Sequence, residues 1–366
     1  MKTTFKNLLF FSLFAGGTLF AQSENESAAA KEFDKKYKKY TENNEAENAK
    51  NSLKTAKDLI DLASENPETK DNVKTQYYKA LIYLELANQE KSKEYQSIAN
   101  KYLALAFNNQ VDKYKEKIQQ FIDQKSNTIF NNGVNAFNEK KYDVAPFLFL
   151  ESIETKQVLG QNMPDALKYA LQSFKKALSD NRVEKKVAES QKLIDQMFAK
   201  LPSNRDLFLI VLEDQLEVKN LDNYEKYTEQ FVKTYPTDTV NKTFYYNLAT
   251  CQLQKMEFEK AETNYKKALK LHGMYIDAIY QLAVTYITWS TTKSKEADKL
   301  QPKDPKYKAL YEESNKLLAK GASALEKYVS VETTDRAALI TLSNAHSNLG
   351  NTQKAIDYKA KADAIK

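Results

Sequence analysis

Small and large apolar residues recur at helical spacing along most of the chain. Residues 244–273 show the pattern most clearly, with Ala249, Ala261 and Ala268 as small positions and Phe258 and Tyr265 as large ones. Because Ala261 and Ala268 are two helical turns apart, they share one face of a helix. Lys, Glu and Asn fill most of the remaining positions. The pattern predicts amphipathic helices whose contact faces carry small side chains.

The same register returns elsewhere in the chain. The Leu-Ala pair at 248–249 is followed by a second Leu-Ala pair at 282–283, which is 34 residues later. The chain has only 7 Gly and 7 Pro in 366 residues, too few turn residues for a β-rich fold. The other matching positions are Ala56, Ile60 and Ala63, then Gly133, Tyr142, Ala145, Phe149 and Ser152, and finally Leu342, Ser343, Gly350, Ala355 and Ala362.

This pattern resembles the tetratricopeptide repeat (TPR), in which each 34-residue unit forms two antiparallel helices. The resemblance implies an all-α fold, a right-handed α-solenoid of antiparallel helix pairs. Small residues then stand where two helices approach closely, and large ones fill the adjoining gaps. We therefore expect Ala261 and Ala268 to be close-approach positions.

The strength of the pattern divides the chain into regions. Residues 22–44 have little apolar periodicity, which predicts a polar, partly disordered N-terminal segment in which a frayed tail is followed by a polar helix. We expect N-terminal TPR-like repeats over 45–164 and C-terminal TPR repeats over 165–366, with a softer joint near 156–165. A charged insertion around 291–305 predicts an extended connection before a helix that begins near Lys306.

The first 21 residues have the layout of a cleavable secretory signal. Lys2 and Lys6 precede a short apolar run, and the small residue Ala21 stands before a polar stretch. The run is too short for a membrane span and is broken by Gly16 and Gly17. We expect cleavage after Ala21 and export to the periplasm or the outer-membrane periphery of a Gram-negative bacterium. The ending resembles export signals of Bacteroidetes-type bacteria.

Charge and cysteine content exclude several classes of function. The formal net charge is +6, and removal of the two signal-segment lysines lowers it to +4. Lys and Glu are interleaved without a dense basic block, so we expect no nucleic-acid partner. Cys251 is the single cysteine, so no intrachain disulfide can form. Nothing after residue 21 reads as a membrane span.

The TPR resemblance also implies which side chains line a concave groove. In such repeats the groove is formed by fixed positions on the first helix of each pair. Two of them, Tyr246 and Tyr280, occupy the same repeat position, so we expect them to stack in one column. An aromatic, apolar groove suits an extended peptide or an amphipathic helix; the alternative is that these side chains contact each other or the insertion. The implied groove residues are Phe130, Phe137, Tyr246, Thr250, Leu253, Tyr280, Val284, Ile287, Ile340 and Asn344.

The remaining candidates for chemistry have simpler structural interpretations. His272 and His346 are the only histidines and belong to different repeats, so we expect no metal site and an internally bonded His346. Cys251 is expected on the buried face of its helix as an inert thiol. Trp289 is expected to end its helix and to hold the insertion.

No catalytic or cofactor motif is present. The S-x-x-K form at 290–293 lacks the partner motifs in the required order, and no Gly-rich phosphate loop or G-x-S-x-G occurs. We expect no cofactor and no enzymatic activity. The sequence Asp-Thr-Val at 238–240 resembles a short O-glycosylation acceptor, which makes Thr239 a candidate modification site.

The resulting hypothesis is an exported, non-enzymatic TPR scaffold that binds a protein or peptide in its concave groove. Two alternatives remain open at this stage. The groove aromatics would also serve as stacking platforms for a small or polymeric ligand such as a glycan. The insertion at 291–305 would also serve as a contact for self-assembly, which would make the protein a homo-oligomer.

Overall fold

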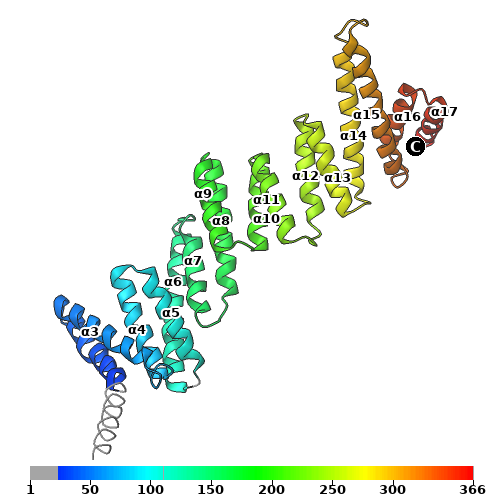
Figure 1. Cartoon of the computed structure of the whole chain (residues 1–366). Coiled ribbons are helices and arrows are strands. Elements are labelled where there is room, and N and C mark those ends of the chain that lie inside the picture. The colour runs from blue at the N-terminus through cyan, green and yellow to red at the C-terminus, as the bar shows by residue number, and fades with distance from the viewer. Residues whose placement is uncertain (1–23, 110, 366) are drawn as a thin grey trace, which may run out of the picture. The chain divides into compact units, whose positions relative to one another are not determined.

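The computed structural model describes residues 24–109 and 111–365, which form helices and contain no β-strand (Figure 1). The predicted all-α fold of antiparallel helix pairs is confirmed. The chain folds into two compact units, one ending at Asn181 and the other beginning at Arg182. This division lies near the end of α8, whereas the boundary expected from the sequence, between 164 and 165, lies at its start. The proposed signal peptide, residues 1–21, lies outside the described residues.

The first unit is a succession of helices joined by short connections. Its helices are the π-helix η1 (Glu32–Tyr37), α2 (Lys38–Glu42), α3 (Ala46–Glu65), α4 (Val73–Glu90), α5 (Lys93–Asn108), α6 (Asp112–Asn138), α7 (Ala145–Gln157) and α8 (Pro164–Val183).

The N-terminal segment contains a helix, as expected, but this helix is packed on one face, in contrast to the polar helix after a frayed tail expected for 22–44. Residues 24–42 form a continuous helix that includes η1. Ala29, Phe33 and Tyr37, spaced four residues apart, are buried in one cluster with the apolar face of α3. The Tyr37 hydroxyl also donates a hydrogen bond to Glu85 of α4, at 2.5 Å. Few apolar residues suffice here because their regular spacing places them all on one face.

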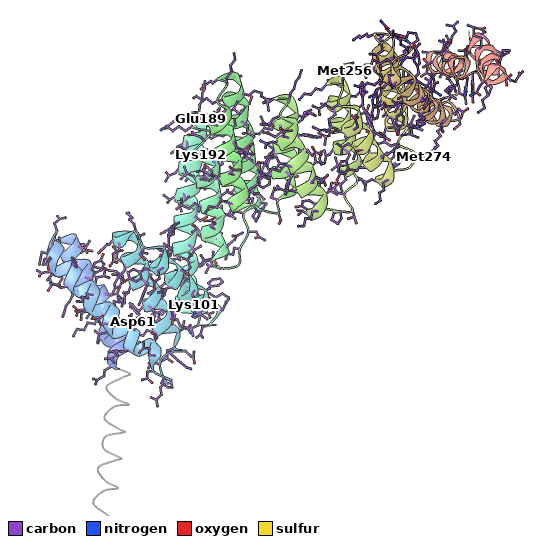
Figure 2. The ribbon with its side chains drawn as sticks, turned by 45° about the horizontal axis from the view of Figure 1, so that its top comes forward. Asp61, Lys101, Glu189, Lys192, Met256 and Met274 are labelled. Carbon is purple, nitrogen blue, oxygen red and sulfur yellow. The ribbon has the colours of Figure 1, made fainter. Side chains whose placement is uncertain are left out.

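Asp61 of α3, labelled in Figure 2, is the centre of a polar cluster between α3 and α4. Its carboxylate lies 2.9 Å from Lys57 Nζ and 3.2 Å from Lys79 Nζ, and it accepts a hydrogen bond from the Tyr83 hydroxyl at 2.9 Å. Burial works to raise the pKa of Asp61, but the hydrogen bonds and the lysine charges outweigh it and lower the pKa. The folded protein therefore favours the ionised carboxylate.

Helices α6 and α7 approach each other at residues with very small side chains. A Cβ added to Gly133 would lie 2.9 Å from the Phe149 ring, so only glycine fits without displacing that ring. Further along, Ser126 and Ser152 are fully buried, and their hydroxyl oxygens lie 3.1 Å apart. The Ser152 hydroxyl also donates to the Ser126 carbonyl oxygen at 3.1 Å. Small side chains thus set the distance between the two helices.

The second unit repeats the helix pair. The pairs α10–α11, α12–α13, α14–α15 and α16–α17 pack within themselves, and consecutive pairs contact each other. Its helices are α9 (Val187–Lys200), α10 (Arg205–Glu217), α11 (Leu221–Thr234), α12 (Asn241–Gln254), α13 (Phe258–Leu271), α14 (Ile276–Ala297), α15 (Pro305–Val329), α16 (Arg336–Asn348) and α17 (Thr352–Asp363).

The expected close-approach positions are buried in this unit. Ala249, Ala261 and Ala268 are each 0% exposed and belong to one core cluster of α12, α13 and α14. At Gly321 of α15, an added Cβ would lie 2.8 Å from Cγ1 of Ile287 on α14. The helix seams therefore have no room for larger side chains at these positions.

The charged insertion forms the end of a long helical hairpin. Helix α14 continues to Ala297, and α15 begins at Pro305, where the Asp304 side chain caps it by accepting from the Lys306 amide at 2.8 Å. Residues 291–305 are therefore the last turns of α14, a short connection and the first residue of α15. The helix expected near Lys306 is confirmed.

Overpacking a seam should destabilise the fold. We expect Ala261→Leu to lower the free energy of unfolding by about 1–3 kcal/mol, because the added carbons have no space at a fully buried helix contact. Urea unfolding followed by circular dichroism measures the change. Thr263→Leu, at an exposed position of the same helix, is the control. Equal losses in the two variants would contradict the close-approach role of Ala261.

The Asp61 cluster should make stability depend on pH. A carboxyl whose pKa is lowered on folding stabilises the protein above its ordinary pKa of 3.8, and this contribution is lost as the pH falls through the folded-state value. We expect the difference in unfolding free energy between the wild type and Asp61→Asn to be constant near neutral pH and to shrink below pH 3.8. Urea titrations over an acid pH series measure it. A difference that does not change with pH would show that the charge of Asp61 contributes nothing.

Candidate functional site

The second unit presents one face of its first helices that is neither buried nor fully exposed. On α12, Tyr246, Thr250 and Leu253 are half-exposed, and their spacing of four and three residues aligns them along one face. Helix α14 repeats this arrangement with Tyr280, Val284 and Ile287. We call these six residues the A-face. On α16 the predicted Ile340 is half-exposed, and Asn344 is exposed.

Tyr246 is partly engaged in packing within its own helix pair. Its ring centroid lies 5.8 Å from that of Tyr265 on α13 and 5.2 Å from that of Tyr275, which precedes α14. The Thr250 hydroxyl lies 2.9 Å from the Tyr265 hydroxyl and donates to the Tyr246 carbonyl oxygen at 2.9 Å. Burial, followed by the charge of Asp277, raises the pKa of Tyr246. One side of this tyrosine therefore belongs to the core.

Tyr280 has a different aromatic partner. Its ring centroid lies 4.8 Å from that of Tyr328 on α15, whose hydroxyl donates to Asp335 at 3.0 Å. Tyr280, Tyr328 and Ile287 all pack against one buried cluster formed by residues of α14 to α17, and Ile287 lies against Gly321. Tyr246 thus contacts the second helix of its own pair and the residue before α14, and Tyr280 contacts the second helix of its own pair. Part of each tyrosine ring therefore contacts neighbouring groups of the protein itself, as the alternative interpretation of the groove positions expects.

The two predicted groove residues of the first unit lie in aromatic clusters of α6. Phe130 makes edge-on contacts with Phe149 at 5.2 Å and with Tyr169 at 5.8 Å, measured between ring centroids. Phe137 contacts Tyr142 at 5.2 Å. Both are half-exposed, and each has much of its ring covered by a neighbouring helix or turn. These contacts give them a packing role in the first unit.

His346 is an internally bonded residue, as expected. It is 4% exposed, its Nε2 lies 3.0 Å from a Glu326 oxygen, and its ring stacks on Tyr358 at 5.6 Å. Its Nδ1 lies 3.2 Å from the Asn351 side-chain nitrogen. Burial works to raise the pKa of Glu326, but hydrogen bonds from Lys354 and His346 outweigh it and lower the pKa. His272 is exposed, and the described residues contain no group of three or more His, Cys, Asp or Glu placed to hold a metal.

Two side chains differ from their expected positions. Cys251 is half-buried rather than buried and lines a cavity of about 460 Å³ with Lys219 and Thr250. Burial raises the pKa of its thiol, against the charges of the nearby lysines, so the unreactive thiol form is favoured. Trp289 does not end its helix, since α14 continues to Ala297. Its ring stacks on Phe258 of α13 at 5.7 Å, so it joins two helix pairs.

Ser290 and Thr239 complete the sequence candidates. The Ser290 hydroxyl is buried and lies 2.9 Å from the Ser314 hydroxyl, so it serves the seam between α14 and α15. Thr239 is exposed in the turn between α11 and α12. The carboxylate of the neighbouring Asp238 accepts a hydrogen bond from Arg205 Nε at 2.7 Å. The turn is thus fixed by Asp238 and leaves the threonine accessible.

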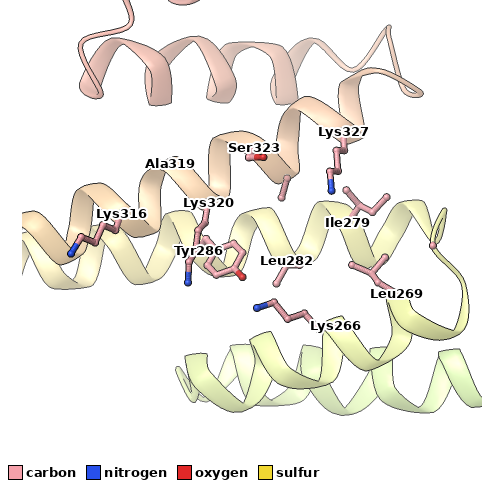
Figure 3. Close-up of a pocket in the computed structure, with 12 residues that line it drawn as sticks. Lys266, Leu269, Ile279, Leu282, Tyr286, Lys316, Ala319, Lys320, Ser323 and Lys327 are labelled. Atoms are coloured by element: carbon pink, nitrogen blue, oxygen red, sulfur yellow. The ribbon is translucent and has the colours of Figure 1, made fainter.

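Sequence reasoning missed a lysine-lined cavity on another side of α14. The cavity has a volume of about 630 Å³ and lies between α13, α14 and α15 (Figure 3). Lys266 comes from α13, and Lys316, Lys320 and Lys327 come from α15. The α15 lysines are spaced by four and seven residues, which indicates a common helix face. Their meeting with Lys266 depends on how three helices pack, which no single stretch of sequence reveals.

Comparisons with known proteins find fold-level likeness to helical-repeat structures. The crystal structure of MamA covers 52% of this chain and 89% of its own, at 17% identity and a TM-score of 0.36. PilW, a type IV pilus biogenesis factor, covers 66% and 93%, at 19% identity and a TM-score of 0.33. A solved TPR domain covers 89% and 92%, at 13% identity and a TM-score of 0.28. No protein-family model and no curated protein matches the chain.

The TPR-like architecture therefore rests on the helix pairs and the buried small residues described above. No helix within residues 24–109 or 111–365 has the length and apolar character needed to span a membrane.

Proposed function

We propose that this protein is an exported, non-enzymatic interaction scaffold that holds a protein or peptide segment on the A-face of its second unit. The observation that carries the proposal is the alignment of Tyr280, Val284 and Ile287 on one half-exposed face of α14. Helix α12, which carries the equivalent residues Tyr246, Thr250 and Leu253, is in contact with α14. Together the two helices supply adjacent apolar and aromatic positions.

The chemistry of the A-face favours a peptide over a reacting small molecule. Aromatic and aliphatic side chains bury apolar anchors of a partner, and such helix or peptide recognition reuses ordinary packing. Tyr246 and Tyr280 are already held by neighbouring rings, so they lose little side-chain freedom when a partner binds. Within the described residues the A-face brings together no nucleophile with a general base. The function is positioning of a partner.

Glycan binding and self-association are the two alternative functions, and the experiment described next distinguishes them from peptide binding. A glycan would use the open ring faces of the two tyrosines, and self-association would use the tip of the α14–α15 hairpin around 291–305. Neither has an observation of its own that favours it over a peptide.

Capture of a partner from the native cell envelope tests the proposal. We expect Val284→Glu to lose a protein that the tagged wild type enriches, because a charge on the A-face opposes apolar contact. Val284 is half-exposed, so the variant should stay folded, and circular dichroism checks this. Thr263→Glu, on an exposed position of α13, is the matched control. The captured protein must then bind the purified wild type and not the variant.

Other results would contradict the A-face proposal. Equal capture by both variants would place the partner elsewhere. Stabilisation by glycans without a protein partner would favour the ligand-binding alternative. A dimer that disappears on replacement of residues 298–304 would favour self-association.

Export is the second part of the proposal. It is supported by the basic, apolar and small-residue order of the first 21 residues. We expect the protein from its native host to begin at Gln22, as measured by intact mass and N-terminal sequencing. The same intact mass reports on Thr239, since a glycan there adds mass that Thr239→Ala removes. A chain that retains residues 1–21 would contradict cleavage.

A further inference from the structure

The cavity between α13, α14 and α15 uses a different part of α14 from the A-face. Ile279, Leu282 and Tyr286 line it, whereas the A-face of the same helix carries Tyr280, Val284 and Ile287. The two sets are spaced by three and four residues within themselves and lie on different sides of the helix. A ligand in the cavity and a partner on the A-face would therefore touch separate surfaces.

Positive charge gathers around the cavity. Figure 3 shows Lys266, Lys316, Lys320 and Lys327 around the same opening, from α13 and α15. Among the described residues, no carboxylate lies within 4.0 Å of the Lys316 or Lys327 ammonium group. Along α15 the lysines are separated by about 6 Å and about 10 Å, given a rise of 1.5 Å per residue. The cations thus form a row rather than a single point.

One carboxylate partly offsets this charge. Glu262 lies 2.6 Å from Lys266 Nζ and 3.8 Å from Lys320 Nζ, and it accepts a hydrogen bond from the Tyr286 hydroxyl at 2.6 Å. Burial works to raise the pKa of Glu262, but the Lys266 and Tyr286 hydrogen bonds outweigh it and lower the pKa. Within 4.0 Å of the four ammonium groups, the described part of the chain places one carboxylate, that of Glu262, which leaves an excess of positive charge.

The inner wall of the cavity is apolar. Leu269, Ile279 and Leu282 contribute aliphatic surface, and the Tyr286 ring is 4% exposed with its hydroxyl already bonded to Glu262. The wall therefore offers contact area and few free hydrogen-bonding groups. A ligand that fits has an apolar group for the wall and negative charges for the rim.

We propose that this cavity binds an acidic peptide segment of a protein partner, with one leucine or phenylalanine side chain against the apolar wall and Asp or Glu side chains against the lysine row. Charge complementarity and the linear spacing of the lysines carry the assignment. A nucleic acid fits less well, because the lining has no arginine and no exposed aromatic ring on which a base would stack. A free phosphate ion would leave the apolar wall unused.

Peptide binding to the purified chain from residue 22 to its end tests the proposal. The probe is a fluorescein-labelled peptide of Glu and Leu, followed by fluorescence anisotropy. We expect saturable binding that weakens as salt is added, because the lysine–carboxylate attraction is screened. Lys316→Glu/Lys327→Glu should raise the dissociation constant about tenfold or more. Lys270→Glu/Lys299→Glu, which makes the same charge change at exposed positions outside the cavity, should leave it nearly unchanged.

Two further variants test the shape of the cavity and its independence from the A-face. Ala319→Trp, at an exposed position of the cavity lining, should block binding without changing the charge. Val284→Glu should leave peptide binding intact, so a failure of the A-face proposal and a failure of this one are distinguishable.

Specific outcomes would overturn the proposal. Absence of binding, or equal binding by the two lysine double variants, would show that the cavity does not recognise the acidic peptide. Equal binding of a peptide that has Ser in place of Leu would show that the apolar wall has no role. Equal competition by single-stranded oligonucleotide or by inorganic phosphate would assign the site to phosphate groups instead.

Discussion

The close approach of helices is the constraint on which the rest of this structure depends. Gly133 lies against Phe149, and Gly321 lies against Ile287, at distances that leave no room for a Cβ atom. Ala261 is likewise fully buried. With no disulfide available, stability comes from these tightly packed seams between neighbouring helices. A small side chain at a seam lets two backbones come close, and the large side chains beside it then fill the space.

Packing of this kind decides which surfaces remain for binding. Each helix has several faces, and the seams occupy the ones that carry small residues. On α14, Ala283 faces a seam, whereas Val284 stays half-exposed on the A-face and Ile279 lines the lysine cavity. The helix faces that take no part in the seams are therefore the ones available for binding a partner. For this reason two unlike surfaces, one apolar and aromatic and one cationic, occur on the same helix.

The sequence predicts the fold well because the repeat is local. The positions of Ala249, Ala261 and Ala268 are sufficient to place two helices and their contact face. Features formed between distant segments are harder to predict. The lysine cavity is lined by Lys266 of α13 and by residues 316–327 of α15. Trp289 of α14 stacks on Phe258 of α13, which belongs to the preceding helix pair. The sequence predicts a polar helix in the N-terminal segment, but not its packing: the polar composition of residues 24–42 hides the four-residue spacing of Ala29, Phe33 and Tyr37, which could have revealed their buried face.

The buried serine pair of α14 and α15 has a consequence for how this hairpin can vary. Ser290 and Ser314 join the two helices through hydroxyl and backbone groups at the point where the extension begins. The seams of the repeat core lie on one side of this serine pair, and the last turns of α14 and the first turns of α15 extend beyond it on the other side. Whole helical turns can be added to or removed from this extension without altering the core seams. The length of the hairpin is thus free to change while the A-face and the lysine cavity keep their geometry.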